Sequence, residues 1–422
     1  SSMQDSSHTI SMDGMVYLLD NQINISTQML VSNKYGGANY NGIYGNIAYT
    51  PPGNFNGWID YYMYEKGLDI NTLGYLWRDD YTQIKAGLGY NSYESYGIFT
   101  NISFSIQADM EENIEGLDLG KTREFLFDLE FENFYSVGGG YYHIDSHFDD
   151  RKIIYDIDNK DFGPSVPIPT IYGTHLNLAT DKHQKLWASI HFTSASNTRN
   201  DIEEGQFIEL TYKPNPYISF ITSYDRYRLM KKYHWIESLK EQVDGWHHIL
   251  SDLNRQIDTW TLRLLGNINR KLSLHGYLEI FSNYDLYTSY SEFSPVSNQY
   301  EETSYISGVA DQIGDPWSGM PVYSTNITNL EGANATSYVD PNLYAGYYPK
   351  YTSMIFNGII KWNYMKGSNI YFVLSFNKSI NGTPFRSIND FSDFLSFNSQ
   401  KPWVEVLRDY TFMVKIDYWF EK

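Results

Sequence analysis

The sequence predicts an all-β chain folded as an antiparallel transmembrane β-barrel, and three observations carry this prediction. Apolar and polar residues alternate in runs about as long as the ~9 to 11 residues that a tilted membrane strand needs. Turn residues separate these runs. The 422 residues include 39 Tyr, 23 Phe and 10 Trp, although mean hydropathy is only −0.45. Aromatic girdles around a polar lumen produce that combination in outer-membrane barrels.

The last strand shows the alternation most clearly, and the same pattern returns at residues 101–108, 125–132, 186–193 and 354–363. Successive side chains of a strand point to opposite faces, so each run supplies one lipid-facing and one lumen-facing set. The lipid-facing set is predicted to include Phe104, Phe127, Phe131, Phe356, Phe412 and Val414. The lumen-facing set is predicted to include Gln107, Asp128, Glu130, Asn357 and Lys415.

About 17 strands are predicted, in order, at residues 8–19, 22–33, 42–51, 55–66, 79–93, 95–111, 121–134, 135–148, 169–181, 185–196, 203–215, 217–233, 255–269, 271–290, 353–367, 368–381 and 408–420. Tight turns such as Asp20-Asn21 follow the odd-numbered strands, whereas most joins after even-numbered strands are long. Short turns in the periplasm and long loops outside are typical of outer-membrane barrels. We therefore expect one barrel domain over residues 1–422, with long extracellular loops at 234–254, 290–352 and 382–407.

An odd number of strands leaves the barrel without closure. The first strand, near Thr9 to Leu19, and the last, near Arg408 to Phe420, would both run toward the periplasm. They cannot pair directly, because neighbouring barrel strands are antiparallel. We therefore expect an odd number of further strands from an upstream part of a larger, even-stranded barrel. The alternatives are a miscount by one strand, or a first segment that hangs from an outer loop.

Composition and charge exclude several function classes. The absence of cysteine removes thiolate metal sites, thiol nucleophiles and disulfides. A net charge of −19 argues against a nucleic-acid partner and against an anion pore. Within the strands, the acidic residues Asp109, Asp128, Glu130 and Glu132 predict an acidic lumen that favours neutral or cationic solutes.

Four stretches resemble a Bacteroidota outer-membrane barrel family of unknown function. They are DINTLGYLWRDD at 69–80, residues 251–281, IIKWNYMKGSNIYFVLSFN at 359–377 and FMVKIDYWF at 412–420. The family motif falls on Asp69, Asn71, Gly74 and Arg78, and the sequence departs from the family pattern at Thr72, Asn363 and Met365. The resemblance implies an outer-membrane barrel that follows an N-terminal carbohydrate-binding module of the xylanase type. It assigns no biochemical activity.

The longest predicted loop is rich in aromatic residues that can stack on sugars or contact proteins. The candidate ligand-binding residues are Trp317, Tyr323, Tyr338, Tyr347 and Tyr348. The alternative is a structured loop whose aromatic residues form a small core of their own. A second candidate is the segment from Trp235 to Leu250, where apolar residues recur at helical spacing and predict a short amphipathic helix. Its Trp235 and Trp246 are candidate partner contacts, or they pack on neighbouring loops.

No cofactor or metal site is predicted. The acidic residues between Asp149 and Asp161 lack the spacing of a calcium loop, so a solvated acidic loop is predicted there. His143 and His147 lie four residues apart on a predicted strand, roughly 13 Å, which is too far to share one ion. Motifs of serine hydrolases, zincins and NTPases are missing. No catalytic residue is assigned, although paired carboxylates of a glycosidase could be present among 50 acids.

Three functions therefore stay open. The first is an outer-membrane barrel, in contact with membrane lipid, that binds or passes extracellular saccharide or peptide. The second is a non-catalytic scaffold barrel that recruits partner proteins into an outer-membrane complex. The third is a carbohydrate-active hydrolase. Flux through liposomes and binding to a glycan array distinguish the first from the second.

Overall fold

A computed structural model describes residues 7–34, 37–70, 76–92, 94–156, 161–241, 245–294, 299–302, 311–314, 321–324, 350–381 and 406–419. Seventeen strands of nine or more residues form the described framework, which confirms the predicted all-β antiparallel class and strand number. No helix in these ranges has the length and hydropathy of a membrane span.

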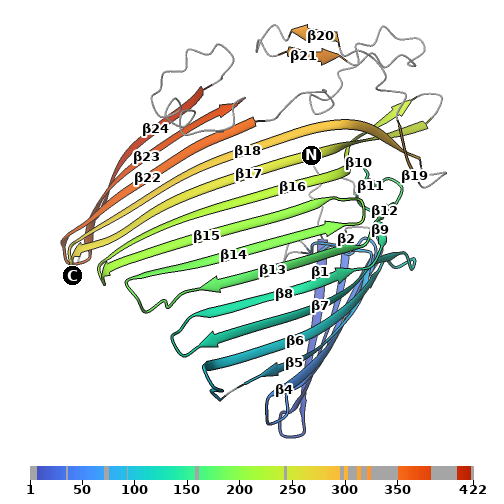
Figure 1. Cartoon of the computed structure of the whole chain (residues 1–422), viewed down its shortest axis with the longest axis horizontal. Helices are drawn as coiled ribbons and strands as arrows, with labels where there is room; N and C mark the ends of the chain where they lie inside the picture. Colours follow the sequence, from blue (N-terminus) through green and yellow to red (C-terminus); the bar gives the residue numbers. More distant parts are fainter. Residues whose placement is uncertain are drawn as a thin grey trace. The chain divides into compact units, whose positions relative to one another are not determined.

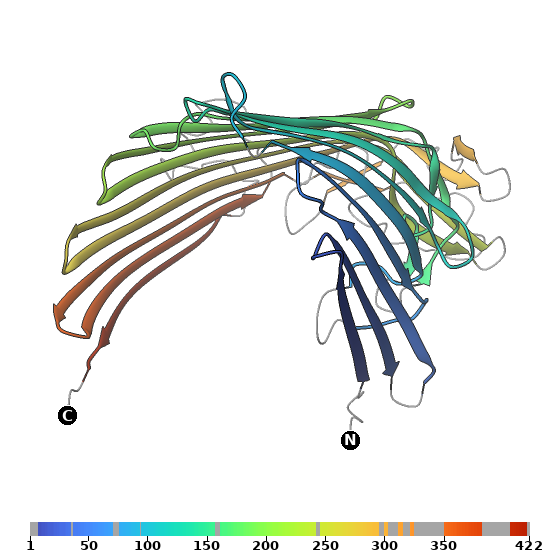
Figure 2. The ribbon, with the colours of Figure 1, turned by 90° about the horizontal axis from the view of Figure 1, so that it is seen from below.

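The chain divides into two compact units. The first unit consists mainly of residues 1–152 and 156–176, and the second contains most of the remaining chain. The long strands of the first unit are β1 (Ser7–Leu18), β2 (Ile23–Lys34), β3 (Asn39–Tyr49), β4 (Phe55–Tyr64), β5 (Tyr81–Asn91), β6 (Phe99–Glu112), β7 (Asp118–Phe131) and β8 (Ser136–Ile144). Each pairs antiparallel with the next in sequence. Figure 1 shows β4 to β8 side by side, and Figure 2 shows the first three strands, in dark blue, as neighbours.

The second unit is built in the same way. Its long strands are β14 (Leu186–Asn197), β15 (Ile202–Asn215), β16 (Ile218–Glu241), β17 (Gly245–Asn269), β18 (Leu272–Ser294), β22 (Lys350–Met365), β23 (Ser368–Asn381) and β24 (Val406–Asp417). From β15 to β24 the antiparallel ladder runs through these strands in order. Strand β13 (Ile171–Ala179), most of which belongs to the first unit, pairs with β8 of that unit. Short strands occur at β9 (His147–Asp149), β10 (Ile154–Asp156), β11 (Asp161–Phe162), β12 (Val166–Ile168), β19 (Gln299–Glu302), β20 (Asp311–Gly314) and β21 (Pro321–Ser324).

The two faces of each ladder differ in chemistry, as the alternation predicts. Residues paired across an antiparallel ladder share a face. The pairs Ile47↔Ile59 and Ile106↔Phe125 lie on one face, and Asn46↔Asp60 and Gln107↔Glu124 lie on the other. We call these the apolar face and the polar face. In the second unit, Phe412 pairs with Leu374 on the apolar face, and Lys415 pairs with Tyr371 on the polar face.

The segment predicted as an amphipathic helix is a β-hairpin, so that prediction is wrong. Residues 231–241 of β16 pair with 245–253 of β17, and the predicted loop 234–254 is mostly strand. The register shifts between Lys231 and His234 and again between Trp235 and Glu237. Each shift adds one residue to β16, so the side chains that follow it point to the opposite face from the one that strict alternation predicts, and the two-residue period is broken. A strand with two such bulges therefore shows apolar spacing that fits a helix.

Several connections also differ from the prediction. The joins at 113–117 and 198–201 are short although they follow even-numbered strands. The predicted loop 290–352 contains the end of β18, the short strands β19 to β21 and the start of β22. The predicted loop 382–407 lies outside the described residues up to 405.

A run of three glycines, Gly138 to Gly140, removes all side chains from the centre of β8. A Cβ on Gly139 would lie 2.6 Å from the backbone oxygen of His175, and one on Gly140 would lie 2.6 Å from the Leu126 side chain. No residue other than glycine fits these contacts without movement of the neighbouring strands. We call this run the glycine seam.

Candidate functional site

The polar face of β3 to β7 gathers aromatic, amide and charged side chains in adjacent rows. One row runs across Asn46, Asp60, Lys85, Asp109 and Thr122, as the strand registers show. The next row toward the 65–80 connection contains Tyr44, Tyr62, Gln83 and Glu111. We call Tyr44, Asn46, Asp60, Tyr62 and Lys85 the polar-face cluster.

Asp60 lies at the centre of this cluster. Its Oδ1 accepts hydrogen bonds from Asn46 Nδ2 at 2.6 Å and from the Tyr44 hydroxyl at 3.3 Å. The Tyr44 and Tyr62 rings lie 4.8 Å apart at 33°. The second carboxylate oxygen, Oδ2, accepts no hydrogen bond from the described residues. The half-buried carboxylate can therefore accept a hydrogen bond from a ligand hydroxyl or amide while two protein donors hold it in place.

An indole ring extends the cluster along β4. The Trp58 ring covers Gly87, where a Cβ would lie 2.7 Å from Trp58 Cε2. The ring can lie against the sheet because Gly87 has no side chain. Lys85 Nζ lies 5.5 Å from the centre of the same ring, a cation–π arrangement. An aromatic face beside a carboxylate, an amide and an ammonium group offers both stacking and hydrogen bonding to a polar ligand.

Acidic side chains dominate this face. Those in the strand interiors are Asp60, Asp109, Glu111, Glu124, Asp128 and Glu130, and Lys85 is the basic side chain among them. Several are held by neighbours, because Glu111 Oε1 accepts from the Tyr81 hydroxyl and from Gln83 Nε2, both at 2.8 Å, and Glu124 accepts from Gln107. Glu132, predicted with this set, lies in the turn after β7 instead. A surface of this charge repels anions.

The motif residue Arg78 has a structural role. Its Nη2 donates to both carboxylate oxygens of Asp150, at 2.8 and 2.7 Å, and the two side chains are only 8% and 14% exposed. Next to this pair, Arg151 donates to Asp79, whose other oxygen accepts from the backbone N–H of Gly67. These contacts tie the 65–80 connection to the segment after β8.

This network corrects the prediction of a solvated acidic loop for Asp150. Its charge is compensated by a buried arginine from a distant part of the chain. Of the other motif residues, Asp69 donates its backbone N–H to Ser32 Oγ at 3.1 Å, while Asn71 and Gly74 lie outside the described residues.

The aromatic candidates of the longest loop are not brought into this site by the described structure. Trp317, Tyr338, Tyr347 and Tyr348 lie outside the described residues. Tyr323 lies in β21, where its backbone pairs with Gln312 of β20.

The two candidate partner contacts lie in the hairpin. Trp235 Nε1 donates to Ser238 Oγ at 3.2 Å, and Trp246 is paired in register with Lys240. The predicted histidine pair is split between elements, because His143 lies in β8 and stacks on Tyr172 at 4.9 Å, whereas His147 begins β9. No cluster of metal-ligating groups occurs in the parts of the chain that the structure describes.

Sequence reasoning missed the polar-face cluster. The strand FNGWIDYYMY carries the signal, since Trp58, Asp60 and Tyr62 alternate with Ile59 and Tyr61. One face of a single strand is thus aromatic and acidic. The other residues of the cluster come from β3 and β5. The sequence of one strand does not tell which residues of the neighbouring strands lie beside it.

The family model of a domain of unknown function, DUF5916, matches residues 6–308. Among solved structures, one similar chain is the siderophore receptor PirA from Acinetobacter baumannii, known from a crystal structure. The two chains are 10% identical at a TM-score of 0.42, and the match covers 100% of this chain and 72% of the receptor chain. No curated protein matches the sequence. Similarity at this level carries no argument about what the chain binds.

Proposed function

Since the chain belongs to the DUF5916 family, which assigns no activity, we propose a function from its own residues: it forms the wall of an outer-membrane β-barrel that binds and passes neutral or cationic saccharides. The observation that carries the proposal is the two-faced sheet. One face is lined by exposed apolar side chains such as Ile59, Leu88 and Ile106, and the other carries the polar-face cluster. A membrane barrel needs this division between lipid and lumen.

Saccharide fits the polar-face cluster better than an anionic solute does. Sugar rings offer apolar C–H faces to aromatic rings and hydroxyl groups to carboxylates and amides. Trp58, Tyr44 and Tyr62 supply the rings, and Asp60 Oδ2 supplies a free acceptor. Peptides can bind to the same groups, so the test also includes short peptides as the alternative ligands. The acidic residues along the face disfavour sulfated or carboxylated ligands.

The test uses the full protein in liposomes. We expect liposomes that contain it to swell in neutral oligosaccharides and in glucosamine oligomers, and to swell much more slowly in uronate oligomers of the same size. Binding of the permeating sugar should weaken roughly ten-fold or more in Asp60→Ala, because a hydrogen bond to a charged group contributes ~1.5–3 kcal/mol.

The matched control is Ile59→Ala, which lies one residue away on the apolar face and should leave flux and binding unchanged. Equal flux of neutral and uronate oligomers would contradict the charge argument. A faster flux of short peptides than of sugars would identify peptides as the ligands. Release of shortened sugars would instead identify a hydrolase.

A second function is favoured by one specific observation. Strands β16, β17 and β18 continue past their neighbours, because the β15–β16 ladder ends at Ile202↔Met230 while the β16–β17 ladder continues to Glu241↔Gly245. Leu250, Phe293 and His248 are buried in this extension. A projecting β-structure with its own core can recruit a partner protein. Stable copurification of a partner that is lost when residues 236–248 are replaced by a short turn, without any sugar flux, would support the scaffold function over the first proposal.

The outer-membrane location, the bacterial phylum, an upstream carbohydrate-binding module and the further strands expected between Thr9 and Phe412 stay predictions. Protease accessibility on whole cells tests the location, because residues of the hairpin at 241–245 should be cleaved from outside.

A further inference from the structure

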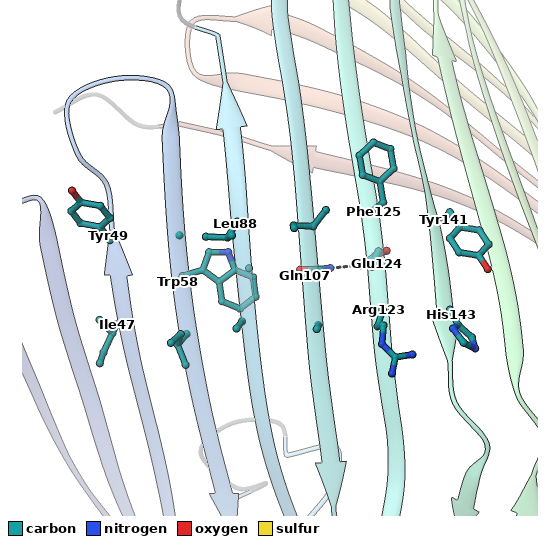
Figure 3. A pocket seen from close by; sticks show the side chains of 16 residues that line it. Ile47, Tyr49, Trp58, Leu88, Gln107, Arg123, Glu124, Phe125, Tyr141 and His143 are labelled. Carbon is teal, nitrogen blue, oxygen red and sulfur yellow. Dashed lines mark hydrogen bonds between the residues drawn. The ribbon is translucent and has the colours of Figure 1, made fainter.

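A hollow of about 820 Å³ lies on the apolar face of β3 to β8 (Figure 3). It belongs to the first unit alone. Its floor is formed by small residues, because Ala86 of β5 and Ala108 of β6 are direct register partners and Gly57 of β4 lies diagonally next to them. Larger side chains stand around this floor, among them Ile59, Leu88 and Phe125.

The hollow has a direction. From β7 to β4 it crosses three strand spacings, about 14 Å. The path runs from Arg123 over Ala108 and Ala86 to Gly57, since Ala108 pairs with Arg123 and with Ala86. All of these residues except Arg123 are apolar. At the Gly57 end the Leu88 side chain lies over the backbone, because a Cβ on Gly57 would be 3.0 Å from Leu88 Cδ2. The path is therefore an apolar trough with Leu88 at one end and Arg123 at the other.

Arg123 is the unexpected residue of this face. It lies on the same face as Phe125 and donates from Nη1 and Nη2 to Asp145, both at 3.0 Å. These contacts use two of its five N–H donors. Its side chain stays 59% exposed, and Lys121, on the same face, is 37% exposed. An arginine on the lipid face is costly at mid-membrane and tolerated near the interface. Arg123 therefore marks the level of the lipid headgroups.

The second unit shows the same arrangement independently. Arg226 lies on the face of Trp260 and Leu262, is 44% exposed and donates from Nε to Asp258 at 2.8 Å. In both units, therefore, a partly exposed arginine that is paired with a carboxylate lies on the face of the exposed apolar residues. In the second unit Gln206, Arg228 and Gln256 share that face with the pair.

From this geometry we propose that the hollow is a binding site for an anionic phospholipid, with one acyl chain in the trough over Ala108 and Ala86 and the phosphate at Arg123. Guanidinium groups pair with phosphate through parallel N–H donors, and the remaining donors of Arg123 are available for this. The inference rests on the proposed function, because it requires the apolar face to lie in lipid.

The test measures lipid selectivity in reconstituted vesicles. The protein is placed in phosphatidylcholine bilayers that contain spin-labelled phosphatidylglycerol or spin-labelled phosphatidylcholine, and the immobilised fraction is compared. We expect wild-type protein to prefer phosphatidylglycerol roughly two- to five-fold, in line with the ~1 kcal/mol that one cationic side chain contributes near an anionic lipid surface. Arg123→Gln and Ala108→Phe should each reduce the ratio to about one, the first by removing the charge and the second by filling the trough.

Matched controls separate these effects from general damage. Arg263→Gln removes an arginine of the polar face, which lies over the Tyr277 ring, and Leu210→Phe enlarges an exposed apolar residue of β15. Both should keep the wild-type ratio, and Asp145→Asn should raise it. A protein that inserts and resists urea extraction but shows a ratio of one, or a ratio unchanged in both Arg123→Gln and Ala108→Phe, would overturn the lipid site alone. Failure to insert into the bilayer would overturn the proposed function together with it.

Discussion

The buried ion pair between Arg78 and Asp150 provides the sharpest test of how the 65–80 connection is held. Removal of one partner leaves the other charge buried without compensation. For side chains only 8% and 14% exposed, the expected loss is about 3–5 kcal/mol in the free energy of unfolding. We therefore expect Asp150→Ala to be strongly destabilising, since Arg78 Nε is already buried without a hydrogen-bond partner.

The structure contains a natural control for this prediction. Arg123 and Asp145 form the same type of pair, but the arginine is 59% exposed. At the headgroup level assigned to Arg123, water and lipid headgroups solvate both partners when they separate, so such an exposed pair contributes little. Asp145→Ala should therefore destabilise the protein far less than Asp150→Ala, although the hydrogen-bond lengths are similar.

The assay is urea unfolding of the vesicle-inserted protein. The fraction of folded protein at each urea concentration is measured from its mobility in a gel. A double variant, Arg78→Met with Asp150→Leu, should recover most of the stability lost in Asp150→Ala, because no charge is left buried. Equal losses for Asp150→Ala and Asp145→Ala, or a loss below about 1 kcal/mol for Asp150→Ala, would refute the argument that burial makes this pair important.

Three further predictions concern the polar face and a turn. Replacement of Asp109 and Asp128 by asparagine should lower the cation preference of the conductance, measured as a reversal potential in planar bilayers, and an unchanged potential would place these residues outside the ion path. Gly87→Ala should weaken sugar binding with little loss of stability, because the new Cβ would stand 2.7 Å from Trp58 Cε2 and displace the indole, and calorimetric titration with the permeating sugar would detect this. The backbone N–H of His183, and after it the Gln184 side chain, lower the pKa of Asp181 in the turn after β13. Its stabilisation should thus be complete above the unfolded pKa of about 3.9 and should disappear as pH falls through the lower folded pKa. Unfolding curves of wild-type protein and Asp181→Asn should converge in acid, and a constant difference down to low pH would count against this role.

The strand framework was predictable because β6 and β7 have no irregularity between Asn101 and Glu111, so the two-residue period survives. That period assigns Phe104 and Gln107 to opposite faces without any structure. The period fails where bulges interrupt a strand, as between Trp235 and Glu237 in β16, and the sequence then mimics a helix. Local pattern carries no information about how many residues a bulge adds.

The site was less predictable than the fold. The register of three strands brings Asp60 beside Asn46 and Lys85, and the pattern within one strand does not give its register with its neighbours. Arg78 and Asp150 are 72 residues apart, and an acidic residue in a loop looks solvated until its partner is known. The acidic character of the polar face was predictable from Asp109, Asp128 and Glu130, because the two-residue period within each strand is enough to separate them from the apolar set.

The glycine seam has a consequence for the order in which the chain assembles. Gly138, Gly139 and Gly140 cannot set the register of β8 by their own side chains, and a glycine-rich strand is prone to slippage. Leu126 of β7 and His175 of β13 lie so close to the seam that a register slip would bring a side chain of β8 against them. Strand β8 therefore needs the edge of β7 to be formed first. Its register is not fully fixed until β13, which follows the 145–170 segment in the chain, has paired with its other edge. We expect the pairing of β8 with β13 to be a late step in the folding of this part of the chain.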